Sequence, residues 1–193
     1  MNLKELIYRN RTIRRFDQSV RISHQELEDL VDLARVTSNA GNNQALKYVL
    51  VTDPAMCQVV FDTLKWAAAL PDWDGPEEGE RPSAYIIAIH DESISKNILW
   101  DLGLAIQSIT LGAVDKGYGG CQFGSVNFPA LKAGLGITDE AHKPLMVLAL
   151  GKPIEQVELT DLPANAQTTY WRDDDQVHYV PKRQLSDIIL KRF

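Results

Sequence analysis

The longest helical pattern in this chain is residues 95–116, SKNILWDLGLAIQSITLGAVDK. Apolar side chains take up so much of it that little of a helical cylinder is left polar. The pattern therefore predicts a helix that is buried on most sides, either at the centre of a domain or in a subunit interface. The apolar positions are Ile98, Leu99, Leu102, Leu104, Ala105, Ile106, Ile109, Leu111, Ala113 and Val114.

The rest of the chain supplies strands and helices that can cover this helix. Apolar runs predict strands at residues 46–52, 84–90 and 144–150, and a shorter strand through Phe123. The elements interleave, but their spacing does not follow a regular βαβ cycle. The sequence therefore favours an α+β or mixed α/β fold, with a sheet covered by helices, over a doubly wound parallel sheet.

Helix starts are marked by capping residues. Ser23-His24-Gln25-Glu26 has the form of a capping box and predicts a helix over 23–36. Asp53-Pro54 and Asn127-Phe128-Pro129 place a capping side chain next to an early helical proline, which predicts helices from about 54 to 64 and from 128 to 134. A short helix at the N-terminus is also expected, whereas residues 151–176 show little periodicity.

Length and charge narrow the class of protein. The 193 residues fit a single domain over 1–193, and a net charge of −6 with a pI near 5.2 argues against broad binding to nucleic acid or an anionic membrane. The chain shows neither a secretory signal nor an apolar run of membrane-spanning length, so a cytoplasmic location is expected. The two cysteines and four histidines lack metal-ligand spacing, so no metal site is expected.

A basic cluster follows the first helix in Arg11-Thr12-Ile13-Arg14-Arg15. Arginine presents a planar fork of donors that matches phosphate oxygens, and a threonine hydroxyl adds a neutral donor. In an extended segment residues 12 and 14 face one side, so a local irregularity is needed for Arg11 to join them. The segment predicts a phosphate site, with surface salt bridging as the alternative.

A polar loop follows the second helix, Ser38-Asn39-Ala40-Gly41-Asn42-Asn43-Gln44. Each carboxamide carries a donor and an acceptor, which suits a ring edge of alternating carbonyl and imide groups. A capped turn is the alternative, because Asn and Gly dominate turns for backbone reasons. A phosphate site and a ring-reading loop together suit flavin mononucleotide (FMN).

Other motifs are less specific. Gly117-x-Gly119-Gly120-x-x-x-Gly124 leaves a helix and enters a strand, whereas the dinucleotide fingerprint does the reverse, so that interpretation is rejected. These glycines either let backbone N–H groups approach a flat ligand or cap the helix and form a turn. Hydrolytic motifs are absent from the sequence. Asp101, an acid inside the apolar helix, is either structural or catalytic.

Taken in this order, the motifs resemble the FMN-dependent nitroreductase family. The similarity extends over nearly the whole chain, through Asp101-Leu102-Gly103-Leu104-Ala105-Ile106-Gln107 and Gly119-Gly120-Cys121 to Val180-Pro181-Lys182-Arg183. It implies α/β/α layers with a mixed, mainly antiparallel sheet flanked by helices. It also implies a homodimer with two FMN sites at its interface.

The resemblance implies which residues bind FMN. The family's Arg-Arg-Ser-x-Arg segment holds the phosphate and maps onto residues 10–14, and its Pro-Ser-x-x-Asn-x-Gln loop, usually from the second subunit, maps onto 38–44. A backbone N–H at Gly124 or Ser125 would face the flavin N5, Lys65 would lie near the pyrimidine or ribityl chain, and a C-terminal basic pair would lie near the phosphate. The expected cofactor-binding residues are Arg11, Thr12, Arg14, Ser38, Asn39, Asn42, Gln44, Lys65, Gly124, Ser125, Lys182 and Arg183.

The function implied by this resemblance is that of an NAD(P)H-dependent flavin oxidoreductase. It would take hydride from NADH or NADPH and then reduce a small electron-poor acceptor, such as a nitroaromatic compound or a quinone, by a ping-pong mechanism. The flavin carries the chemistry, so no catalytic side chain is expected. The alternatives are a flavin-binding sensor or storage protein without turnover and a phosphate-binding protein without flavin. The acidic loop 70–83 is predicted to form part of a substrate rim, or else an ordinary solvated loop.

Overall fold

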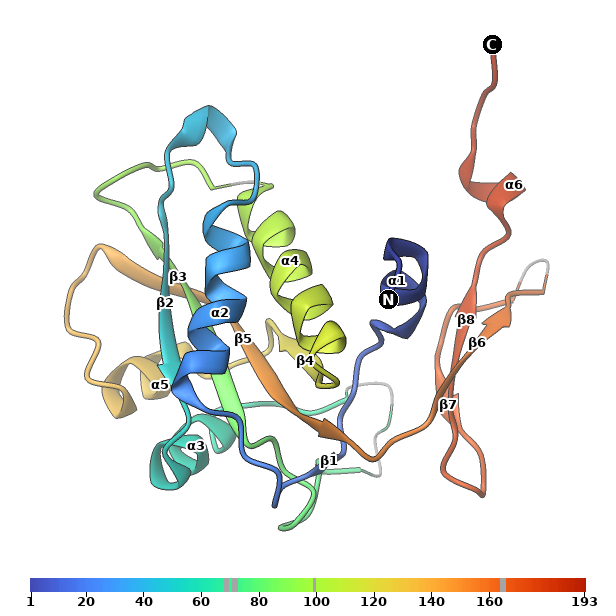
Figure 1. Cartoon of the computed structure of the whole chain (residues 1–193), viewed down its shortest axis with the longest axis horizontal. Helices are drawn as coiled ribbons and strands as arrows, with labels where there is room; N and C mark the ends of the chain where they lie inside the picture. The colour runs from blue at the N-terminus through green and yellow to red at the C-terminus, as the bar shows by residue number, and fades with distance from the viewer. Residues whose placement is uncertain (68–69, 71–72, 99, 164–165) are drawn as a thin grey trace.

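The computed structural model describes residues 1–67, 70, 73–98, 100–163 and 166–193, and its centre is an antiparallel sheet (Figure 1). Strand β3 (Ala84–Asp91) lies between β2 (Leu46–Val51) and β5 (His142–Pro153), and β4 (Gly119–Phe123) pairs with the opposite edge of β5. The two-residue strand β1 (Phe16–Asp17) pairs with the last residues of β5. The predicted strands are confirmed.

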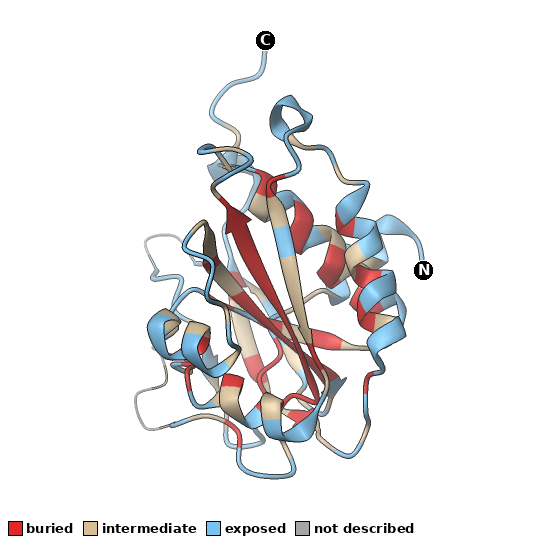
Figure 2. Ribbon diagram, turned by 90° about the vertical axis from the view of Figure 1, so that its left-hand side faces the viewer, coloured by how far each residue is buried: buried red, intermediate tan, exposed pale blue. Residues whose placement is uncertain are grey.

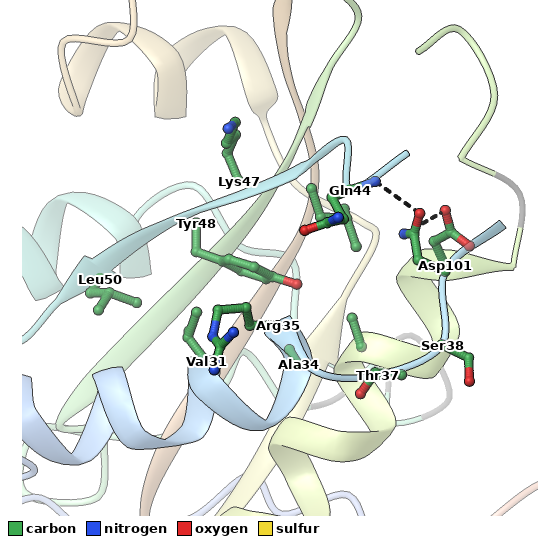
Figure 3. A pocket seen from close by; sticks show the side chains of 13 residues that line it. Val31, Ala34, Arg35, Thr37, Ser38, Gln44, Lys47, Tyr48, Leu50 and Asp101 are labelled. Carbon is green, nitrogen blue, oxygen red and sulfur yellow. Dashed lines mark hydrogen bonds between the residues drawn. The ribbon is translucent and has the colours of Figure 1, made fainter. Parts of the chain in front are cut away.

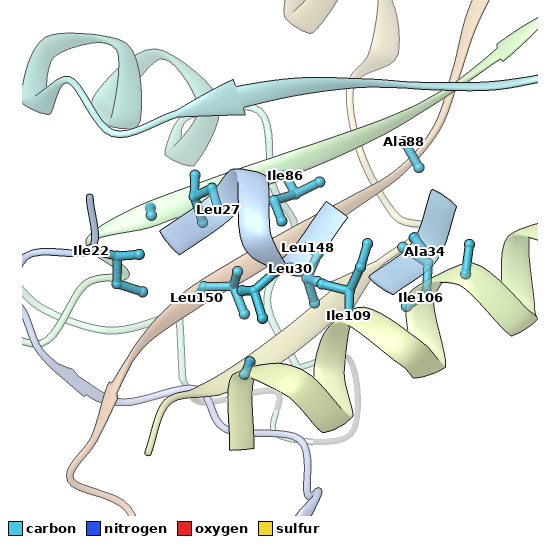
Figure 4. Packing of buried hydrophobic residues seen from close by; sticks show 13 residues of the cluster. Ile22, Leu27, Leu30, Ala34, Ile86, Ala88, Ile106, Ile109, Leu148 and Leu150 are labelled. Atoms are coloured by element: carbon cyan, nitrogen blue, oxygen red, sulfur yellow. The ribbon is translucent and has the colours of Figure 1, made fainter. Parts of the chain in front are cut away.

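Helices cover both faces of this sheet. On one face, α2 (His24–Arg35) and α4 (Asp101–Asp115) pack against side chains of β3 and β5 (Figure 4). On the other, α3 (Pro54–Phe61) and α5 (Phe128–Gly134) pack against the alternate side chains of the same strands. All eight residues of β3 are therefore buried (Figure 2). The predicted α+β class, with α/β/α layers, is confirmed.

The capping signals in the sequence act as predicted. In α1 (Leu3–Arg9), the Asn2 side chain accepts from the Glu5 backbone N–H while Glu5 reaches back to Asn2, and Ser23 and Glu26 form the same reciprocal box before α2. Helix α3 ends at Phe61, earlier than expected. The chain leaves the helix there because the next residues turn and Leu64 forms a bridge with Val126.

Helix α4 begins at Asp101, six residues later than the pattern predicts. The Ser95 hydroxyl accepts from the Asn97 backbone N–H (3.1 Å), which closes a turn in place of a helical start. Leu99, part of the predicted helix, lies outside the described residues. Trp100 is 72% exposed and Leu104 is 45% exposed, so the prediction of burial on most sides does not hold for this face within one chain.

The C-terminal arm, residues 155–163 and 166–193, lies on the side of α1 and away from the main sheet (Figure 1). Its strand β8 (His178–Lys182) pairs in parallel with β6 (Val157–Asp161) and antiparallel with β7 (Trp171–Arg172), and a short α6 (Leu185–Ile188) follows. The sequence did not reveal β6 and β7 because neither contains a fully buried residue and so neither carries an apolar pattern.

Both cysteines are free and buried. Cys57 lies on α3 with its thiol directed at backbone carbonyl oxygens, and burial raises its pKa to about 11. Cys121 lies on β4, where burial raises its pKa to about 12. Neither thiol has the low pKa of a reactive cysteine.

None of the helices that the structure describes combines the length and apolar character that a membrane span requires.

Candidate functional site

The arginine segment runs alongside β4. Thr12 forms a parallel bridge with Gly120, and the Ile13 N–H donates to the Gly120 carbonyl (2.9 Å). Gly120 also lies close to β5: a Cβ there would stand 2.8 Å from the Ala149 carbonyl oxygen. The glycine run predicted to allow close approach of a ligand therefore also allows close approach of the chain itself.

Arg14 is the most buried arginine of the segment. It is 8% exposed, its guanidinium lies 4.8 Å from the centre of the Tyr170 ring, and its Nη1 has no hydrogen-bond partner among the described residues. Arg11 donates from Nη2 to the Ile7 carbonyl (2.8 Å), but its Nε is likewise buried without a partner in the described part of the chain. Burial lowers the pKa of Arg11. Buried donors without acceptors are costly, and these two suit an anionic group such as a phosphate.

The alternative of salt bridging applies to the next arginine. Arg15 donates from Nε and Nη2 to the two carboxylate oxygens of Glu80, at 2.7 and 2.6 Å. This bidentate pair ties the acidic loop to the segment. Thr12, by contrast, is exposed next to β4, so its hydroxyl is accessible.

The end of β4 brings together three further predicted residues. Gly124 and Ser125 are exposed, and the Ser125 carbonyl accepts from the backbone N–H of Lys65 (3.1 Å). A Cβ on Gly124 would meet no atom within 4 Å, so space is open there. An extended strand covers about 13 Å between Gly120 and Gly124, so one strand connects the arginine segment with this open end.

The amide loop, residues 39–44, is held by Asp101 (Figure 3). The Asp101 Oδ2 accepts from Asn39 Nδ2 (2.8 Å), and its Oδ1 accepts from the Ala40 backbone N–H (2.9 Å). Asn39 Oδ1 in turn accepts from the Gln44 N–H (2.8 Å). Asn42 and Gln44 are exposed, whereas the Asn39 side chain forms hydrogen bonds with Asp101 and the Gln44 backbone within the chain.

A cavity of about 370 Å³ lies between α2 and β2, next to the amide loop (Figure 3). Ser38, Asn39 and Gln44 line it together with Asp101, and its remaining wall is mostly apolar. Arg11 lines a different cavity of about 340 Å³, which includes Val114. Since Asp101 and Val114 are about 20 Å apart along α4, the amide loop and the arginine segment of one chain lie at opposite ends of that helix.

Lys182 and Arg183 lie on the C-terminal arm. Lys182 ends β8 and its carbonyl accepts from the Leu162 N–H (2.8 Å). Both residues are exposed, and in the described part of the chain neither side chain forms a hydrogen bond or ion pair with the arginine segment. Within one chain, no described hydrogen bond or ion pair therefore joins this predicted basic pair to Arg11, Thr12 or Arg14.

The sequence did not point to a charged cluster formed by Glu155, Arg172 and His178 of the arm next to Arg14. The Glu155 carboxylate is fully buried and accepts from Arg172 Nη2 (2.6 Å) and from the Arg14 backbone N–H (2.7 Å). His178 is 1% exposed, with its Nδ1 3.6 Å from Glu155. Burial, with Arg14 and Arg172 nearby, lowers the pKa of His178, although Glu155 opposes the effect.

Aromatic side chains connect this cluster to the end of β4. The Arg172 guanidinium lies 4.5 Å from the centre of the Trp73 ring, Trp73 meets Trp66 edge to face at 6.1 Å, and Trp66 packs on Phe123 at 4.6 Å. Trp73 of the acidic loop is thereby connected through Trp66 to Phe123, the last residue of β4, and the role of this loop as a substrate rim stays a prediction. Pro71 and Asp72 of that loop lie outside the described residues.

Comparison with known proteins places this site in a family. A model of the Nitroreductase family matches residues 7–152, which is more than half of the chain. A search of curated protein sequences found no match.

Three solved structures show the same fold. A protein from Exiguobacterium sibiricum, described as a nitroreductase in complex with FMN, is 18% identical, covers 89% of this chain and 98% of its own, and has a TM-score of 0.70. A gut-bacterial enone reductase of fatty acid saturation metabolism is 17% identical, with 86% and 94% covered and a TM-score of 0.67. A Parabacteroides distasonis protein described as an NADH dehydrogenase/NAD(P)H nitroreductase is 18% identical, with 79% and 88% covered and a TM-score of 0.65.

The FMN complex among these structures agrees with the cofactor expected from the sequence. Identities this low establish a shared fold, while the family model covers the arginine segment, the amide loop, α4 and β4. The chain belongs to the nitroreductase family.

Proposed function

We propose that this protein is an FMN-dependent oxidoreductase that oxidises NAD(P)H and reduces a small electron-poor acceptor, such as a nitroaromatic compound or a quinone, by a ping-pong mechanism. Family membership supports the flavin chemistry. The relatives described as an NAD(P)H nitroreductase and an enone reductase support the donor and the class of acceptor. A cytoplasmic location and a single domain over residues 1–193 stay predictions from the sequence.

The observation that carries this proposal is the course of the arginine segment along β4. At one end, buried guanidinium donors of Arg11 and Arg14 have no acceptor among the residues that the structure describes, and at the other, open end Ser125 and Lys65 meet. FMN has a phosphate and a ring separated by a ribityl chain, and this strand offers a site for each in that order. When bound, FMN supplies the hydride chemistry.

The side chains of this chain bind and orient the cofactor. Arg11 and Arg14 would hold the phosphate with the exposed Thr12 hydroxyl, and Lys182 and Arg183 would add charge there if the arm reaches the site in the assembled protein. Backbone N–H groups at Gly124 or Ser125 would face the ring edge, and the Lys65 ammonium would place positive charge near it. None of these groups needs to act as a nucleophile or a base.

The amide loop belongs, in this proposal, to the FMN site of a second copy. Within one chain it lies at the other end of α4 from the arginine segment, so one cofactor cannot easily touch both. A homodimer would place Ser38, Asn42 and Gln44 of one protomer at the ring held by its partner. Trp100, which directly precedes α4, and Leu104 on α4 are exposed and offer apolar surface for such a contact.

The absorption spectrum of the purified protein tests this function. We expect a yellow protein that bleaches on anaerobic addition of NADH or NADPH and regains its colour when a quinone or a nitroaromatic compound is added. A yellow protein that neither donor bleaches would support the flavin-binding sensor or store instead. A protein that stays colourless after soaking in excess FMN would refute the proposal.

A further inference from the structure

We infer that Asp101 is a positioning residue that fixes the amide loop, residues 39–44, in the conformation that presents its carboxamides to a flavin. The inference rests on the proposed function, because it concerns how that loop serves the FMN site of a partner chain. Asp101 itself would not touch the cofactor. It is 3% exposed and lies in the first turn of α4, behind the loop (Figure 3).

The contacts of Asp101 connect the two ends of the loop. One carboxylate oxygen accepts from the Asn39 side chain and the other from the Ala40 backbone at the start of the loop. Asn39 then accepts from the backbone N–H of Gln44 at the end of the loop. A single buried acid thereby closes a ring of hydrogen bonds around the segment that carries the exposed carboxamides.

The backbone of the loop needs such a restraint. Gly41, Asn42 and Gln44 have φ values of 59°, 53° and 53°, all in the left-handed region, and two of these residues are not glycine. Left-handed residues cost free energy and persist where the surrounding structure holds them, and they concentrate at functional sites. Here the left-handed residues include Asn42 and Gln44, two exposed residues of the loop that carry carboxamides; the Gln44 Nε2 donates to the Asn42 carbonyl (3.4 Å).

The donor and acceptor pattern requires a carboxylate at position 101. Both of its oxygens accept, and both partners, Asn39 Nδ2 and the Ala40 N–H, can only donate. An asparagine at 101 would turn one of these contacts into a donor facing a donor, whichever way its amide is oriented. An aspartate at 39 would instead face the Asp101 carboxylate with like charge.

Exchanging the two residues restores every contact, which gives a sharp experiment. In the double variant Asn39→Asp/Asp101→Asn, the amide at 101 would donate to the carboxylate at 39 and still accept from Ala40, and residue 39 would still accept from Gln44. The four proteins to compare are the wild type, the two single variants and the double variant. Asp115→Asn is the matched control, because it removes an exposed acid at the other end of the same helix.

Three measurements are made on each protein. They are FMN dissociation constants from fluorescence quenching, the absorption band of bound FMN at saturation, and hydrogen exchange of residues 39–44 without FMN. We expect each single variant to weaken FMN binding about 10-fold or more, to shift the band and to speed exchange. The double variant should return all three readouts to near the wild type, and the control should change none.

The outcomes separate this inference from the proposed function. Single variants that bind FMN as tightly as the wild type, with an unshifted band, would overturn the positioning role while leaving the function intact. A double variant worse than either single would overturn it as well, since Asn39 would then act by direct contact. A wild type that binds no FMN would refute the proposed function, and the exchange data would still decide whether Asp101 restrains the loop.

Discussion

At the scale of single residues, the arginine segment shows how neighbouring side chains of one type take different roles. Arg15 pairs with Glu80, whereas Arg14 is buried against Tyr170 and its Nη1 has no hydrogen-bond partner in the described part of the chain. A folded chain tolerates such a donor where a ligand completes it. Arg14, as the most buried arginine of the segment, is thus the one that we expect to contribute most to binding an anion.

We expect Arg14→Ala to weaken FMN binding by about 1.5–3 kcal/mol, the value of a hydrogen bond to a charged group. Arg14→Lys should lose part of this, because lysine keeps the charge but lacks the planar fork. Fluorescence titration with FMN measures the effect. Arg15→Ala is the control, since its partner is Glu80, and undiminished affinity in the Arg14→Ala variant would refute the phosphate assignment.

We expect His178 to make the free energy of unfolding depend on pH. Burial lowers the pKa of His178 below the ordinary value of 6.5. As the pH falls below 6.5, His178 therefore takes up a proton in the unfolded chain while it is still neutral in the folded chain. The contribution of His178 to the free energy of unfolding is fully present above pH 6.5. As the pH drops below 6.5, this contribution should fall by up to about 1.4 kcal/mol per pH unit.

Urea denaturation at pH 7.5 and 5.5 measures this dependence. His178→Gln should reduce the difference between the two pH values, while His24→Gln, at an exposed position on α2, should leave it as in the wild type. An equal pH dependence in the wild type and His178→Gln would contradict the assignment.

At the scale of helices and strands, β4 links the fold to the site because it lacks side chains where the chain must pass closely. Gly119 lies against Ile13 and Pro153, and Gly120 lies against Ala149 and pairs with Thr12. Close packing of Ile13 on β4 therefore depends on Gly119, and close packing of β4 on β5 depends on Gly120. Gly124, in open space, has no such constraint.

We expect Gly120→Ala to destabilise the protein by about 1–3 kcal/mol, because its Cβ would clash with the Ala149 backbone. Gly124→Ala should change the free energy of unfolding by no more than about 0.5 kcal/mol. Urea denaturation of the two variants checks the contrast. If the two variants had the same free energy of unfolding, the strands β4 and β5 would have to move apart at Gly120 at little cost.

The elements that the sequence predicts well are those whose signals are local. The capping box at Ser23 and Glu26 and the apolar run of β3 depend on nearby residues or on burial of whole strands, so they are visible without the structure. The predicted start of α4 was wrong, because the Ser95 hydroxyl accepts a hydrogen bond from the Asn97 backbone N–H and closes a turn there. Strands β6 and β7 were missed because they pair with β8 without burying an apolar face.

The site was predictable to a similar degree. Motifs pointed to the arginine segment and the amide loop, and Asp101 stood out as an acid in an apolar helix. Its partners could not be predicted, because the hydrogen bonds to Asn39 and Ala40 join residues about 60 positions apart in sequence. The same holds for Glu155 and Arg172, which lie in a stretch without periodicity.

At the scale of the whole molecule, the predicted dimer depends on what covers the outer face of α4. Trp100, directly before α4, and Leu104, in its first turns, expose large apolar side chains at the start of the helix that separates the amide loop from the arginine segment. Contact between two copies through this face would bury them. It would also bring the halves of the proposed FMN site together.

We expect Leu104→Glu to weaken dimerisation by about 2 kcal/mol or more and to lower FMN retention with it, because a charge would enter a desolvated interface. Light scattering after gel filtration measures the mass, and the absorption spectrum measures the flavin. Ile94→Glu, at an exposed turn, is the control. A Leu104→Glu protein that is dimeric and yellow would exclude this face as the interface.

The reactivity of the two buried thiols can be used to measure local unfolding of the protein. Ellman's reagent reacts with thiolates. Because Cys57 and Cys121 are buried and have raised pKa values, neither should react with the reagent in the folded protein. Cys57 belongs to a helix on the outer layer, whereas Cys121 lies on the strand beside Arg14. In the Cys121→Ser variant the labelling rate would report the opening of α3 through Cys57, and in the Cys57→Ser variant it would report the opening of β4 through Cys121. We expect FMN to slow the labelling of Cys121.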